Sequence, residues 1–138
     1  MTGYRLLEHT ADMGVEAWAE SVAELFRQMA LGMRQIITAC PAVRTQHELE
    51  IAVSGGDLPE LLVNWLGELV YLLEVRNFVF ADVVIEALDE CSLRARVQGE
   101  TFDPERHYLE REIKAVTHHQ VRVDSGPHGC SARVYVDL

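Results

Sequence analysis

Acidic residues stand near both ends of the chain, where they could share a ligand. Asp12 precedes an alternating stretch, and Asp137 is the penultimate residue, followed by Leu138 with its main-chain carboxylate. If the first and last strands lie side by side, these groups converge, and oxygen ligands without sulfur or imidazole suit Ca²⁺ or Mg²⁺. The alternative is a turn aspartate and a solvated chain end. The residues alone favour this alternative, because chain termini are commonly disordered.

The six histidines offer imidazole, but none stands with partners that would complete a metal site. His118 and His119 fall in an expected strand, where neighbouring side chains point to opposite faces and cannot easily share one ion. Hydrogen-bonded structural roles are therefore expected for most histidines. His107, in "DPERH", is the one for which we favour a functional or loop-fixing role. The sequence assigns no role to His118, His119 and His128.

Signatures of independent catalysis are missing. The sequence has no G-x-S-x-G elbow, and Gly55 and Gly56 are followed by Asp57 rather than by the lysine of a phosphate-binding loop. The three cysteines are far apart and form no C-x-x-C pair, so a zinc ribbon or thioredoxin-like motif is not supported.

Length and charge narrow the class of protein further. The 138 residues suit one domain, residues 1–138, and 49% hydrophobic with 25% charged residues is an ordinary globular composition. No apolar run is long enough to span a bilayer and no signal peptide is evident, so we expect a cytoplasmic protein without membrane contact. A formal net charge of −10 disfavours direct nucleic-acid binding and favours cations and basic protein surfaces.

Hydrophobic periodicity predicts an α+β domain. Helical spacing follows a capping box at Ser21 and should end before Pro41, and a second helix is expected over 58–75 after Asp57. Alternation predicts strands at 13–18, 47–53, 78–88, 92–97, 112–123 and 131–138. The late strands follow one another through short turns. We therefore expect a single two-layer domain, with two main helices packed on one largely antiparallel sheet.

Four sequence blocks together resemble the archease family. They are "HTADMGVEAWAES", "DLPELLVNWLGELVYLLEV", "GETFDPERH" followed by "EIKAVTHHQVRV", and the last strand "ARVYVDL". The blocks stand in the family's order and spacing, and they cover nearly the whole chain. The resemblance implies an archease-like fold.

The resemblance also implies a function. Archeases activate RtcB-type RNA ligases, promoting guanylylation and multiple turnover in tRNA splicing or RNA repair. The ligase carries the covalent chemistry, so this chain would be an activator rather than an enzyme, and it would meet RNA only through the ligase. An acidic protein acting on a basic, RNA-handling partner agrees with the net charge.

The family's functional residues map onto positions at both ends of this chain. Asp12 matches the aspartate of the family's H-x-A-D block, Asp137 matches its C-terminal aspartate, and Leu138 supplies a main-chain oxygen. The resemblance implies that these three hold a divalent cation, Ca²⁺ or Mg²⁺, with Ca²⁺ favoured. Lys114 matches a lysine associated with activity, whose charge would hold an acid or a phosphate near the cation.

Other matched positions have less defined roles. His9, Asp103 and His107 are candidates for partner contact or loop shaping. Two positions depart from the family pattern: Gly67 stands where asparagine is common, and His118 where tyrosine is usual.

Two other functions stay open. One is a stand-alone metal-dependent enzyme acting on a small phosphorylated substrate, and the other is a chaperone-like binding module for RNA-processing enzymes. The missing nucleophile and phosphate-binding loop favour the activator over the enzyme.

Overall fold

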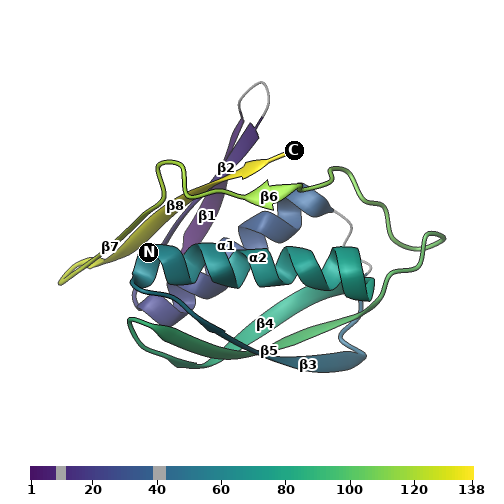
Figure 1. The fold of residues 1–138 in the computed structure, drawn as a ribbon, viewed down its shortest axis with the longest axis horizontal. Coiled ribbons are helices and arrows are strands. Elements are labelled where there is room, and N and C mark those ends of the chain that lie inside the picture. Colours follow the sequence, from purple (N-terminus) through teal and green to yellow (C-terminus); the bar gives the residue numbers. More distant parts are fainter. Residues whose placement is uncertain (9–11, 39–42) are drawn as a thin grey trace.

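Two antiparallel sheets enclose two helices in the computed structural model, which describes residues 1–8, 12–38 and 43–138 (Figure 1). The first sheet joins both chain ends and contains β1 (Gly3–Glu8), β2 (Asp12–Ala19), β8 (Gly129–Asp137), β6 (Ala115–Val116) and β7 (Arg122–Gly126). The second sheet is built from the middle of the chain and contains β3 (His47–Ser54), β5 (Ser92–Thr101) and β4 (Phe78–Leu88).

Both helices begin at side-chain caps. α1 (Val22–Ile37) starts at Ser21, whose hydroxyl accepts the Glu24 N–H at 3.2 Å. α2 (Leu58–Arg76) starts at Asp57, whose carboxylate accepts the Glu60 N–H at 2.9 Å. These bonds satisfy amides that lack a partner in the first helical turn. In the described part of the chain, neither helix is long and apolar enough to cross a membrane.

The helices form a layer between the sheets. α1 contacts β1, β2 and β8 on one side and β4 on the other, while α2 contacts β3, β4 and β5 as well as β6 and β7. A helix covered on two sides must be apolar over most of its circumference. The buried residues of α2 are Leu61, Leu62, Val63, Trp65, Leu66, Leu69, Val70 and Leu72.

Two helices with antiparallel strands confirm the predicted α+β class. The strands divide between two sheets, however, and the helices lie between them, whereas the sequence suggested one sheet in two layers. The difference has a physical reason. Alternation records which side chains of a strand are buried, but not which other strand is its neighbour.

The expected strand over 112–123 is interrupted. In this part of the chain, β6 and β7 pair with β8 as two separate strands, and between them the Val121 N–H donates to the His118 carbonyl at 3.3 Å. Val116 and Val121 both pack against the core, although they stand an odd number of residues apart. A continuous strand would place them on opposite faces, so a turn is needed. β1 was not predicted.

Residues 102–114, here called the 102–114 segment, form neither helix nor strand. Three backbone bonds attach it to the layers: the Phe102 N–H donates to the Asn77 carbonyl, the Glu110 N–H to the Ile37 carbonyl, and the Lys114 N–H to the Asp137 carbonyl. The segment therefore links the ends of α2 and α1 with the end of β8.

A buried carboxylate fixes the start of this segment. Glu100 is 3% exposed and accepts hydrogen bonds from the Arg106 guanidinium and from the Arg44 N–H. The Arg106 bond is the main reason that the pKa of Glu100 falls from 4.5 to about 2. His107 Nε2 lies 3.2 Å from Glu100 Oε2, and His107 Nδ1 accepts the Asp103 N–H at 2.8 Å.

Replacing Gly67 with alanine tests whether this position lies inside a helix with open space beside it. Apart from its chain neighbours and the backbone of the helix itself, no described atom lies within 4 Å of a Cβ built at this position in α2. Glycine inside a helix costs roughly 0.5–1 kcal/mol relative to alanine, so Gly67→Ala should raise the free energy of unfolding by about that amount. Urea denaturation measures it. Gly99→Ala is the control, because its Cβ would collide with the Val79 carbonyl and should destabilise. A destabilised Gly67→Ala would contradict the packing described.

The Glu100 contacts predict a pH-dependent contribution to stability. Because the folded pKa lies below the ordinary value, the stabilisation is fully present above pH 4.5 and is lost as the pH falls towards about 2. Glu100→Gln should lower the melting temperature by several degrees at pH 7, with a difference from wild type that shrinks over this acidic range. Glu50→Gln, at an exposed acid on β3, should change little. A Glu100→Gln deficit that is independent of pH would refute the charge-based explanation.

Candidate functional site

The pairing of β2 with β8 places Asp12 directly opposite Asp137. Figure 1 shows the end of β8 beside β2. Residues directly opposite in an antiparallel pair point to the same face, with Cβ atoms roughly 4.5–5.5 Å apart. Asp12 is half-buried and Asp137 is exposed. These two residues, called the acid pair below, place two carboxylates on one edge of the sheet.

The acid pair lies on the outer face of the sheet. Along β2, Met13 and Val15 are buried against the helices, so alternation turns Asp12 and Gly14 outward. The Tyr135 ring covers Gly14, where a Cβ would come within 2.8 Å of Tyr135 Cε1. Glycine in "ADMG" therefore has a packing reason, which the sequence pattern did not reveal.

Leu138 holds the chain end in place. Its side chain is half-buried and packs against the hydrophobic core, one residue beyond the last residue of β8. The expectation of a disordered terminus, which the residues alone favoured, is therefore wrong. A main-chain oxygen of Leu138 follows directly after the acid pair.

Lys114 reaches this edge through its backbone. Its N–H donates to the Asp137 carbonyl at 2.9 Å, and the next residue, Ala115, pairs with Asp137 in the sheet. The Lys114 side chain is exposed and forms no ion pair with any residue that the structure describes. It is also the only lysine in the chain.

The remaining candidates lie elsewhere. Asp103 and His107 belong to the Glu100 contacts near the start of the 102–114 segment, where they bond to each other. His9 lies outside the described residues. Across residues 1–8, 12–38 and 43–138, no three histidine, cysteine, aspartate or glutamate side chains form a group that could hold a metal ion.

The other histidines do not complete a site. His118 and His119 are exposed in the turn between β6 and β7, rather than in a strand as expected. The His119 ring lies 6.2 Å from the Tyr135 ring. His128 is exposed between β7 and β8.

Two adjacent carboxylates have a clear chemical consequence. Like charges directly opposite each other destabilise a strand pair. A cation bound between them relieves this repulsion, and carboxylates are oxygen ligands that Ca²⁺ and Mg²⁺ prefer. The arrangement thus fits a hard divalent cation better than a nucleophile or an acid–base couple.

A protein-family model agrees with the sequence blocks. The model of the Archease protein family (MTH1598/TM1083) matches residues 4–138. The chain is 40% identical to the protein archease of Methanosarcina mazei over 139 residues, which cover 98% of this chain and 95% of that relative. It is 38% identical to the protein archease of Pyrococcus furiosus over 125 residues, with 88% of each chain covered.

Solved structures share the fold. The solution structure of protein 1598 from Methanobacterium thermoautotrophicum has a TM-score of 0.82 at 29% identity and covers 99% of each chain. The crystal structure of a Thermotoga maritima archease, described as a possible chaperone, has a TM-score of 0.62 at 16% identity and shows the likeness of fold alone. It covers 96% of this chain and 94% of that one. The chain belongs to the archease family.

Proposed function

We propose that this protein activates an RtcB-type RNA ligase through a divalent cation held by the acid pair. The observation that carries the proposal is the register of β2 and β8, which sets Asp12 opposite Asp137. The net charge of −10 supports a basic, RNA-handling protein as the partner and disfavours direct contact with RNA.

The cation would take ligands from three residues. Asp12 and Asp137 would provide carboxylate oxygens, and Leu138 would provide a main-chain oxygen. Ca²⁺ is favoured because it accepts flexible, oxygen-rich coordination, whereas Mg²⁺ requires near-ideal octahedral geometry. The exposed edge leaves room for water or partner oxygens. When bound, the cation would neutralise the acid pair and polarise a phosphoryl oxygen presented by the partner.

Lys114 would act beside the cation. Its backbone is tied to Asp137, so its position is set by the same strand end that carries the acid. Its exposed ammonium group would hold a phosphate or a carboxylate of the ligase complex. We therefore place Lys114 in partner recognition, and we assign the covalent steps to the ligase.

A chaperone-like binding module remains the second candidate, supported by the description of the Thermotoga maritima relative as a possible chaperone. Such a module would stabilise RNA-processing enzymes without needing the acid pair. The two functions therefore differ in whether stimulation requires the carboxylate of Asp137. A stand-alone enzyme on a small phosphorylated substrate would act without the ligase.

Cation binding should be visible as thermal stabilisation. Ca²⁺ that binds the folded state raises stability by RT ln(1 + [Ca²⁺]/Kd), so millimolar Ca²⁺ should raise the melting temperature of the wild type. Asp12→Asn should remove most of this response and, without Ca²⁺, should gain a few tenths of a kcal/mol from lost repulsion. Differential scanning fluorimetry measures both effects. Glu50→Gln serves as the charge-matched control, and an Asp12→Asn response equal to that of the wild type would exclude Asp12 as a ligand.

Ligase stimulation is the functional test. We expect the protein to support multiple-turnover RNA joining when the RtcB-type ligase is sub-stoichiometric to RNA. Asp137→Ala should abolish the stimulation with the fold intact, because the side chain is exposed, and Lys114→Ala should weaken it more than Lys114→Arg. Gel-based joining assays measure the stimulation, and circular dichroism checks that each variant is folded. Full stimulation by Asp137→Ala would favour the chaperone-like module, and no stimulation by the wild type would reject the activator.

A further inference from the structure

An apolar groove lies between the C-terminal half of α2 and the 102–114 segment. Its volume is about 400 Å³. The apolar residues that line it are Ile37, Val70, Leu73, Phe102, Leu109 and Ile113. The groove therefore joins the end of α1 and the end of α2 to a segment that carries no regular structure.

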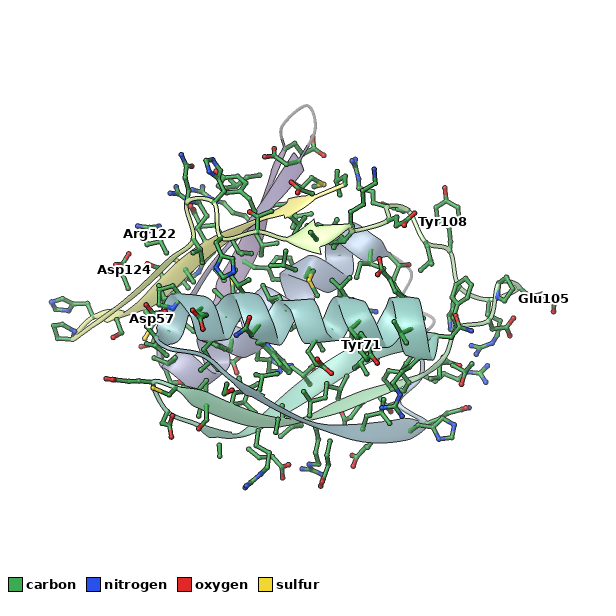
Figure 2. All side chains as sticks on the ribbon, viewed as in Figure 1. Asp57, Tyr71, Glu105, Tyr108, Arg122 and Asp124 are labelled. Carbon is green, nitrogen blue, oxygen red and sulfur yellow. The ribbon has the colours of Figure 1, made fainter. Side chains whose placement is uncertain are left out.

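Exposed hydrophobic side chains are concentrated on α2 and the 102–114 segment, the two elements that form most of the groove, and one of them, Leu109, lines it. Six large hydrophobic residues are exposed in the described part of the chain, and four of them belong to α2 or to the 102–114 segment: Tyr71, Val75, Tyr108 and Leu109. Figure 2 shows Tyr71 on α2 and Tyr108 projecting from the segment. Val75 is 63% exposed and Tyr108 is 70% exposed. Apolar side chains concentrated in this way mark interaction surfaces.

The rim of the groove is acidic. Glu74 and Glu112 line it, and Glu110 stands next to it on the segment. All three are exposed, and none forms an ion pair with a described residue. Arg111, the basic residue in the lining, is already paired with Glu8 at 3.9 Å. A partner that carries lysine or arginine beside its apolar side chains would thus complement both features.

A protein segment fits the groove better than a small molecule does. Small-molecule sites present a few inward-pointing polar groups that fix the ligand's orientation. Among the described residues that line the groove, none has a buried polar side-chain atom without a hydrogen-bond partner. An apolar centre within a polar, exposed rim is typical of protein–protein interfaces. A second copy of this chain is disfavoured, because it would bring another net charge of −10.

We propose that the groove is the docking site for a basic segment of the protein partner, anchored by apolar side chains. The groove is continuous with the acid pair through the chain itself. Glu112 and Ile113 form part of its wall, and the N–H of the next residue, Lys114, bonds to Asp137. A segment seated in the groove therefore brings the partner next to the cation site. The identification of this partner as the ligase rests on the proposed function.

The docking site is tested by measuring two quantities separately: the affinity of the protein for the ligase, and the maximal stimulation of RNA joining at saturating protein. The probe is the RtcB-type ligase, with binding followed by biolayer interferometry and stimulation followed by RNA joining. Leu109→Ser, at an exposed apolar residue that lines the groove, should raise Kd about tenfold, as expected for loss of an apolar anchor, while maximal stimulation returns at saturating protein. Val84→Ser is the matched control, since Val84 is an exposed hydrophobic residue on β4 in the second sheet and does not line the groove. Asp137→Ala should instead lose maximal stimulation.

Reversing the charge of the acidic residues on the rim provides a second test of the docking site. Glu74→Lys combined with Glu112→Lys should weaken binding and flatten its salt dependence, whereas Glu50→Lys should do neither. If both groove variants bind like their controls while the wild type stimulates, the docking site is wrong and the activator proposal stands. If the wild type neither binds nor stimulates the ligase, both proposals fail. If the groove variants change the sedimentation of the protein alone, the groove is a contact between copies of this chain, and the docking proposal is overturned.

Discussion

The antiparallel pairing of β2 with β8 is the interaction on which the rest of the structure depends. It joins residues near the two ends of the chain, so it closes the first sheet over the helices and creates the acid pair in the same step. Like-charged residues would not be placed opposite each other for stability alone. The buried inward residues of both strands, such as Val15 and Val134, supply the stabilisation that holds this repulsive end together.

The helix layer explains why the strand pairing is firm enough to position a site. α2 is buried from two sides, and Trp65 in its centre donates its indole N–H to the Phe26 carbonyl of α1 at 3.1 Å. The sheets therefore rest on a common apolar core. The 102–114 segment, which lacks regular structure, is held by the Glu100 contacts at its start, by the end of α1 at its middle and by Asp137 at its end. Ile113 also packs into the apolar core. The acid pair lies at the end of this segment, and the groove lies along it.

Local signals in the sequence predicted local structure well. The caps at Ser21 and Asp57 placed the starts of α1 and α2, and alternation over 78–88 placed β4, because capping and alternation act over a few residues. β5 begins where expected but runs four residues further, to Thr101. The division into two sheets depends on which strands pair over long distances along the chain, which no local pattern encodes. The turn at 117–121 likewise follows from the pairing of β6 and β7 with β8. β1 pairs with the next strand, β2, and the alternation in the sequence did not reveal it. The candidate ligands came from residue type and family resemblance. That Asp12 and Asp137 face each other required the structure.

The acid pair as a cation site is tested most directly by paramagnetic NMR. Substoichiometric Mn²⁺, a probe that takes the same oxygen ligands, is added to the isotopically labelled protein. The signals of Asp12, Asp137 and Leu138 should broaden first and should recover when Ca²⁺ is added in excess. Broadening that is spread evenly over the exposed acids, or that spares Asp12 and Asp137, would contradict the account.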